Sequence, residues 1–258
     1  MPADASKGDG RHKSLPFSFM QQYFSDTPLK VGEEYIFTKE QAHHARDVVR
    51  LREERIRLVY DGRGFFARAY QKGKEFAAMV EAEDPRTNES AVDLTLVMAL
   101  IRREKFELVL QKATELGVSR IVPMISSRCV VKAREEKAEK QLKRWQDICM
   151  EAARQCKRSR IPEVTDTIAF RGLQSLSAET KLAAYENAWG EAEPLVKALK
   201  TAKSAIVVIG PEGGFSDEEM QEFAAMGYTS VTFGPRILRA ETAAIYACAV
   251  ISAAGEGL

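Results

Sequence analysis

Two glycine-rich turns in the last third of the chain constrain its fold most strongly. Each turn follows a short apolar run: residues 206–209 lead into residues 210–214 (GPEGG), and residues 231–233 lead into Gly234 and Pro235. A glycine at the end of a strand lets the backbone approach a ligand closely, because no Cβ stands in the way. Neither turn has the G-x-G-x-x-G or G-K-[ST] spacing of common nucleotide sites. The pattern indicates a small-molecule site at the ends of parallel strands, of neither the dinucleotide nor the P-loop type.

Apolar runs alternate with helical patterns from residue 92 onward. We expect strands at residues 92–100, 121–125, 182–185, 205–209 and 230–233, and helices at residues 105–116, 140–157, 192–199, 216–226 and 241–254. Gly117 is a typical helix stop, and Ser216 followed by three acidic residues is a typical helix start. This alternation predicts an α/β domain with a mainly parallel sheet. The last helix is apolar nearly all round, which a position in the core explains.

The first third of the chain has a different pattern. Residues 1–19 lack the features of a signal peptide and are expected to form a flexible extension. Short strand patterns at residues 35–37, 56–60 and 65–70, one helix near 39–49 and a hairpin turn at 61–64 predict a small β-barrel-like module. We therefore divide the chain into an extension (1–19), this module (20–84), a polar linker (85–91) and an α/β domain (92–258).

Composition narrows the class of protein without identifying a function. The hydrophobic content of 45% suffices for a core, and no apolar run is long enough to cross a membrane. The four cysteines, Cys129, Cys149, Cys156 and Cys248, form no C-x-x-C pair and are expected to be small buried hydrophobes in a reducing compartment. The three histidines do not cluster with cysteines, which disfavours a zinc site. The net charge of +1 does not by itself indicate a nucleic-acid-binding protein, so any nucleic-acid surface would have to be a local cluster of basic residues.

These turns also carry a resemblance to a known family. Residues 210–215 (GPEGGF) and 234–243 (GPRILRAETA) resemble the signature pair of the SPOUT methyltransferases, and more narrowly the ribosomal RNA small subunit methyltransferase E family. Residues 111–123 and 144–162 are similar to that family's two helix blocks, and His43, His44 and residues 49–52 to its N-terminal module. The match runs in order over about residues 20 to 258. It implies a trefoil-knotted methyltransferase domain with a mainly parallel sheet, preceded by a small PUA-like β-barrel domain that binds RNA.

The resemblance also implies a cofactor, S-adenosyl-L-methionine, held by three loops at strand ends. Its expected binding residues are Tyr185, Glu186, Asn187, Ile209, Gly210, Pro211, Glu212, Gly213, Gly214, Phe233, Gly234, Ile237, Leu238, Arg239, Thr242 and Ala243. Without the family, Ile237 and Leu238 would be read as core residues.

The implied reaction is methylation of a 16S rRNA uridine at N3. That atom bears a proton and lies on the Watson–Crick edge, so the base must be unpaired or flipped. We expect Arg239 to stabilise negative charge on the uracil oxygens, and Glu212 or Glu241 to orient the base or accept its proton. Both acids also have plain structural interpretations, Glu241 at a helix N-terminus and Glu212 in a turn. All three histidines precede residue 45, so none is expected to act as the base.

Basic residues in both parts of the chain are candidates for RNA contacts. The alternative interpretation is that they belong to ordinary solvent-exposed helix faces. The expected RNA-binding residues are Arg46, Arg50, Arg52, Arg102, Arg103, Lys112, Arg128, Arg154 and Arg158. The pair His43-His44 is expected to hold one packed and one exposed ring. The chain departs from the family at Gln22, where an arginine is usual, and at residues 53–55, where a Gly-Asp turn is usual.

The expected partners are 16S rRNA, in the small ribosomal subunit, and a second copy of the chain, with no membrane and no metal, in the cytoplasm. In the family the last helix is tucked through the knot and packs in the homodimer interface. Two alternatives remain open: a knotted enzyme acting on tRNA or another rRNA site, and a non-catalytic ribosome-assembly factor that binds RNA. A nucleotide hydrolase is disfavoured because no Lys-[Ser/Thr] follows the glycines.

Overall fold

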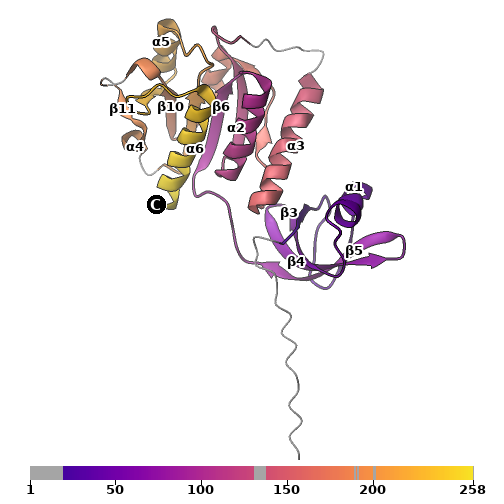
Figure 1. Cartoon of the computed structure of the whole chain (residues 1–258). Coiled ribbons are helices and arrows are strands. Elements are labelled where there is room, and N and C mark those ends of the chain that lie inside the picture. Colours follow the sequence, from indigo (N-terminus) through magenta and orange to yellow (C-terminus); the bar gives the residue numbers. More distant parts are fainter. Residues whose placement is uncertain (1–19, 131–137, 189, 191, 200–201, 258) are drawn as a thin grey trace, which may run out of the picture. The chain divides into compact units, whose positions relative to one another are not determined.

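The chain divides into two compact units, and the boundary in the sequence falls between Arg86 and Thr87. The computed structural model describes residues 20–130, 138–188, 190, 192–199 and 202–257 (Figure 1). The expected extension at residues 1–19 lies outside the described residues. Among the helices that the structure describes, none has the length and apolar character needed to span a membrane.

The first unit is built on a five-stranded sheet with the order β1-β3-β4-β5-β2. Its strands are β1 (Gln22–Phe24), β2 (Glu34–Ile36), β3 (Arg55–Tyr60), β4 (Arg63–Lys72) and β5 (Glu75–Asp84). The hairpin turn predicted between β3 and β4 is present, with Asp61 and Gly62 at φ 46° and 73°. A helix, α1 (Lys39–His43), continues into a π-helical turn (His44–Val48). Our patterns did not include β1 or β5.

A buried ion pair lies inside this first unit. Arg57 and Asp84 both have fully buried side chains, and Arg57 Nε donates to Asp84 Oδ2 at 2.8 Å. Arg57 Nη1 also donates to Oε1 of buried Gln22 at 2.7 Å. Gln22 therefore has an internal structural partner at the position where the sequence departs from the family.

The second unit contains an eight-stranded sheet, with the order β11-β13-β10-β12-β6-β7-β8 and β9 paired to β7. Each strand pairing recorded in its described part is parallel, as predicted. Its strands are β6 (Asp93–Ala99), β7 (Arg120–Ile125), β8 (Glu163–Val164), β9 (Ile168–Ala169), β10 (Thr180–Ala184), β11 (Glu193–Pro194), β12 (Ser204–Ile209) and β13 (Thr229–Thr232).

The helices of this unit follow the predicted order, with one correction. They are α2 (Arg103–Glu115), α3 (Ala138–Cys156), α4 (Leu195–Ala198), α5 (Asp217–Ala225) and α6 (Ala240–Glu256), with 3₁₀ turns at Phe170–Ser175 and Glu186–Ala188. Ser216 and Glu219 form a capping box at the start of α5. The helix expected at residues 192–199 is wrong in its first half. Glu193 and Pro194 pair with β13 as β11, because proline fixes an extended entry and leaves only four residues for α4.

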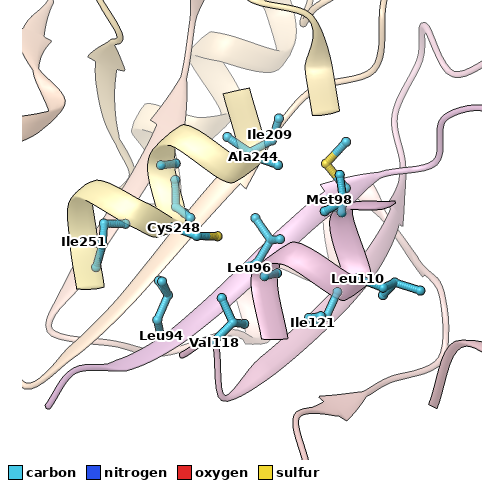
Figure 2. Close-up of a cluster of buried hydrophobic side chains, with 14 of the residues drawn as sticks. Leu94, Leu96, Met98, Leu110, Val118, Ile121, Ile209, Ala244, Cys248 and Ile251 are labelled. Carbon is cyan, nitrogen blue, oxygen red and sulfur yellow. The ribbon is translucent and has the colours of Figure 1, made fainter. Parts of the chain in front are cut away.

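The last helix, α6, is a core element. It packs against α2, α4, β6 and β12. Figure 2 shows Ala244, Cys248 and Ile251 directed toward Leu94 and Leu96 of β6, and all five are nearly or fully buried. Burial raises the pKa of the Cys248 thiol to about 12, so this cysteine behaves as a small apolar residue.

The two faces of the sheet bury different clusters. Leu96 and Met98 join the cluster that includes residues of α2, α3 and α6. Val97 joins the opposite cluster with Phe215 and Phe223. Because both faces are covered, the central strands β6 and β12 are mostly apolar, and the strand ends with the turns after them are the places where a site can form.

Candidate functional site

A cavity of about 260 Å³ lies where β10, β12 and β13 end and α6 begins. The carboxyl ends of parallel strands meet at one edge of a sheet, which brings turns distant in sequence together. Three segments form the walls: the residues after β10, the GPEGG turn after β12 and the GPRILR segment after β13. The two glycine-rich turns singled out in the sequence therefore share one cavity.

Most of the residues expected to bind the cofactor line this cavity. They are Tyr185, Glu186, Ile209, Gly210, Pro211, Glu212, Gly214, Phe233, Gly234, Ile237, Leu238, Arg239 and Ala243. Asn187, Gly213 and Thr242 are not among its lining residues, although each adjoins one. Five further residues that were not expected from the sequence also line it: Ala184, Val231, Thr232, Arg236 and Ala240. The sequence could have indicated these residues only by their position, since each lies near a strand end or in the segment after β13.

Gly214 and Gly234 shape the cavity through their backbones. Gly214 has φ +66°, and an added Cβ would overlap the Glu186 carboxylate and lie 2.9 Å from its Cδ. Gly234 has φ +104°, and no atom lies within 4 Å of the position a Cβ would take. Gly214 thus allows a carboxylate to approach the turn, and Gly234 leaves open space beside it.

Arg128 fixes the GPEGG turn from outside the cavity. Its Nη1 donates to the carbonyl oxygens of Gly213 and Phe215, both at 3.1 Å. A Cβ on Gly213 would lie 3.3 Å from Cβ of Arg128. The missing side chain at Gly213 therefore leaves room for an arginine of this chain.

The buried carboxylate of Glu219 joins two segments close to the GPEGG turn. It accepts the backbone N–H of Ser127 at 2.8 Å and that of Ser216 at 2.9 Å. The segment after β7 and the start of α5 are joined by this one side chain.

Tyr185 connects the first wall of the cavity to α5. Its hydroxyl donates to Asp217 Oδ1 at 2.6 Å, and this hydrogen bond raises the pKa of the Tyr185 phenol. Asn187 Nδ2 donates to the Tyr185 hydroxyl at 3.4 Å. Asn187 therefore supports a lining residue and is not itself a lining residue.

Several charged groups lie in the cavity lining or pair with it. Arg239 is exposed at the N-cap of α6, and its side chain makes no recorded ion pair with the described residues. Lys105 Nζ lies 3.8 Å from Glu212 Oε1 and 3.4 Å from Glu241 Oε2. Lys105 was not among the residues expected in the site. Its position could have indicated the site, because α2 begins just after the carboxyl end of β6, at the same edge of the sheet.

One expected RNA contact belongs to the interior. Arg158 is only 3% exposed and donates to Glu89 Oε2 from both Nε and Nη2, at 3.0 and 2.7 Å. Its Nη1 donates to the carbonyl oxygens of Thr114 and Val118. These internal bonds make Arg158 a structural residue, and we remove it from the candidate RNA surface.

The other candidate RNA residues are distributed between the two units. Arg46, Arg50 and Arg52 are exposed in the first unit, and Arg46 donates to Asp47 at 3.0 Å. In the second unit, Arg103 and Lys112 pair with Glu107 and Glu115. The remaining residues are Arg102, which is exposed, Arg154, which pairs with Glu151, and Arg128 described above.

The adjacent histidines have separate surroundings. His43 is exposed, with Nδ1 2.7 Å from Asp47 Oδ2. His44 is half-buried, and its Nδ1 lies 3.2 Å from the Tyr23 hydroxyl. Across the described parts of both units, no three His, Cys, Asp or Glu side chains are grouped as a metal site would require.

Comparison with known proteins places this geometry among RNA methyltransferases. The profile of the RNA methyltransferase domain matches residues 88–252. The Ribosomal RNA small subunit methyltransferase E of Bacillus subtilis is 32% identical over 247 residues, which cover 90% of this chain and 96% of that protein.

Two solved structures have a similar fold. A putative methyltransferase from Legionella pneumophila, solved with bound cofactor SAM, is 30% identical with a TM-score of 0.83 and covers 92% of this chain and 98% of its own. The Ribosomal RNA small subunit methyltransferase E from Neisseria gonorrhoeae, bound to S-adenosyl methionine, is 31% identical with a TM-score of 0.82, covering 90% and 96%.

Proposed function

This chain belongs to the ribosomal RNA small subunit methyltransferase E family of S-adenosylmethionine-dependent enzymes, and we propose that it methylates N3 of one uridine in 16S rRNA. The observation that carries the proposal is the single cavity formed by the GPEGG and GPRILR turns at the ends of parallel strands. The substrate is proposed to be the RNA of the small ribosomal subunit, and the site of action the cytoplasm.

The residues that line the cavity suit the cofactor chemically. Ile209 and Leu238 provide apolar contacts for an adenine ring, and the open backbone at Gly234 leaves space for a ligand. When bound, S-adenosylmethionine supplies an electrophilic methyl group carried on a positively charged sulfur. The cavity is lined by the carboxylates of Glu186 and Glu212 and by the guanidinium groups of Arg236 and Arg239, which suits a ligand that carries both positive and negative groups. We propose the lining residues as the cofactor site, with Asn187, Gly213 and Thr242 supporting it from just outside.

Arg239 and Glu212 are proposed to act on the target base. Arg239 lines the cavity and is exposed, so its guanidinium is available to donate to the uracil oxygens as negative charge develops on them. Glu212 lines the same cavity and is proposed to accept the N3 proton. The base reaches them only when it is unpaired or flipped out of a helix.

The first unit is proposed to be a PUA-like RNA-binding domain covering residues 20–84, joined by residues 85–91 to the methyltransferase domain. Arg50 and Arg52 are exposed there. Phosphate contacts of this kind position RNA and weaken with salt. The double variant Arg50→Glu/Arg52→Glu should lower RNA affinity and leave the affinity for S-adenosylhomocysteine unchanged. Unchanged RNA affinity would remove these arginines from the proposal.

We also propose a trefoil knot and a homodimer. The knot is what the family resemblance implies, and it is consistent with the path of α6, which follows β13 and packs on β12 and β6, beyond β10. An experimental structure in which the chain from β13 to α6 is not threaded through a loop would contradict the knot. Exposed apolar side chains near the cavity support the dimer: Ile237 is 83% exposed and Tyr246 of α6 is 37% exposed. Light scattering that shows a monomer at micromolar concentration would contradict the dimer.

The decisive experiment measures methyl transfer from labelled S-adenosylmethionine to three substrates: small ribosomal subunits, free 16S rRNA and tRNA. Methylation of a 16S rRNA uridine at N3, identified by mass spectrometry of the nucleosides, is expected. Transfer to tRNA alone would favour a different knotted enzyme. RNA binding without cofactor binding or methyl transfer would favour an assembly factor.

A further inference from the structure

Lys105 connects three segments of the methyltransferase domain that are distant in sequence. It lies in the first turn of α2, Glu212 lies in the turn after β12, and Glu241 lies in the first turn of α6. The Lys105 ammonium is 3.4 Å from Glu241 Oε2 and 3.8 Å from Glu212 Oε1. One cation thus lies between two carboxylates at the edge of the cavity.

The Glu241 carboxylate anchors this lysine. Its side chain is 12% exposed, and its Oε2 is buried without a hydrogen-bond partner among the described residues. An ionised carboxylate in that environment is costly unless a positive charge lies close by. Lys105 is the cation paired with it, so the interaction restricts where the lysine ammonium can lie.

The Glu212 carboxylate lies on the open side of the same ammonium. Its side chain is 33% exposed, and Glu212 lines the cofactor cavity while Glu241 does not. A glutamate in a surface turn can adopt several rotamers. An anchored ammonium favours those that keep the carboxylate at the edge of the cavity.

We propose that Lys105 is a positioning residue for methyl transfer: anchored by Glu241, it orients Glu212 to take the proton from the target base. This inference rests on the function proposed above. In the step concerned, the N3–H bond breaks, the proton passes to a Glu212 carboxylate oxygen, and the electron pair left on nitrogen forms the bond to the methyl carbon. The bond from that carbon to sulfur breaks at the same time, and its electron pair stays on sulfur, which loses its positive charge. Lys105 itself does not contact the base.

The experiment uses the full-length protein and single-turnover methyl transfer to small subunits at saturating cofactor. The variants are Lys105→Met, Lys105→Arg, Glu212→Gln and the double variant Lys105→Met/Glu212→Gln. Lys143→Met is the matched control, because Lys143 pairs with Asp147 at 3.0 Å on the exposed side of α3. S-adenosylhomocysteine affinity by calorimetry and the melting temperature are measured for each variant.

Lys105→Met should slow the single-turnover rate by about 100-fold, the effect of a small misplacement of a reacting group. Its S-adenosylhomocysteine affinity and melting temperature should match those of the wild type. Lys105→Arg should recover most of the rate, because it restores the positive charge. Because Lys105 acts through Glu212, adding Lys105→Met to Glu212→Gln should cause little further loss.

Several outcomes would overturn the inference. These are a wild-type rate for Lys105→Met, losses that multiply in the double variant, or a rate that falls only in step with cofactor affinity. If Lys105→Met does not fold, Glu241→Gln removes the anchoring charge at constant size, and a wild-type rate for that variant would also overturn it. A wild-type protein that methylates no RNA would instead refute the proposed function.

Discussion

Glu186 occupies the space that a side chain at Gly214 would require. The Glu186 carboxylate approaches the GPEGG turn so closely that a Cβ on Gly214 would overlap it. Both residues line the cavity, and they come from segments that follow different strands. The absence of a side chain at Gly214 thus determines where the Glu186 carboxylate can lie.

We expect Gly214→Ala to weaken S-adenosylmethionine binding by about tenfold, the equivalent of one lost charge-assisted contact. The new methyl group would displace the Glu186 carboxylate from the turn. Gly73→Ala is the matched control, because Gly73 has a similar φ of +59° but no atom within 4 Å of its Cβ position. Both variants should lose about 1 kcal/mol of stability from the left-handed backbone. Calorimetry should show no further loss when Gly214→Ala is added to Glu186→Ala; an additional loss would contradict the mechanism.

The cavity could be predicted from sequence because its parts are local. Each glycine turn follows an apolar strand, and the carboxyl ends of parallel strands share one edge, so residues 210–214 and 234–239 were expected to meet. Resemblance to a family then supplied a cofactor and residue roles that spacing alone does not contain. The start of α5 was equally local, since Ser216 and Glu219 form its capping box from within one turn of helix.

Long-range pairing could not be predicted in the same way. Lys105 and Arg158 are ordinary basic residues on helices in the sequence, and only the fold places one between two carboxylates and the other in the interior. The short strands β8 and β9 were missed because two residues carry no periodic signal. In the first half of the helix expected at 192–199, Glu193 and Pro194 form the strand β11, because pairing with β13 outweighs helix propensity.

Arg158→Ala should destabilise the methyltransferase domain by about 3 kcal/mol or more, because it leaves Glu89 partly buried without its cation. The Glu89 carboxylate also accepts the backbone N–H groups of Ser159 and Arg160, so it would remain in place. Arg160→Ala is the control, since its exposed side chain is removed while that backbone contact stays. Urea unfolding measures the difference. Equal stability of the two variants, with lower RNA affinity for Arg158→Ala, would return Arg158 to the RNA surface.

Stability in acid should depend on Glu107. The hydrogen bond from Arg144, helped by one from Arg103, lowers the pKa of Glu107 from 4.5 to about 2. Because the folded-state pKa is the lower one, the stabilisation is complete above pH 4.5 and is lost as the pH falls toward 2. Glu107→Gln should therefore cost roughly 1–3 kcal/mol at neutral pH and progressively less in acid. Urea unfolding from pH 7 downward tests this. A gap between wild type and variant that stays constant below pH 4 would contradict it.

Arg239→Ala should separate binding from methyl transfer. The guanidinium lies at the exposed N-cap of α6, where its loss removes no recorded ion pair within the described residues, so the melting temperature should be retained. If Arg239 stabilises negative charge on the uracil oxygens, single-turnover methyl transfer should fall by about 100-fold, the typical loss of one oxyanion donor. RNA and S-adenosylhomocysteine affinities should change little, because the interaction strengthens only as charge develops on the base. Arg236→Ala is the comparison, since Arg236 lines the same cavity without an assigned role in charge stabilisation. A near-wild-type rate for Arg239→Ala would mean that Glu212 or the RNA itself handles the proton without help from this arginine.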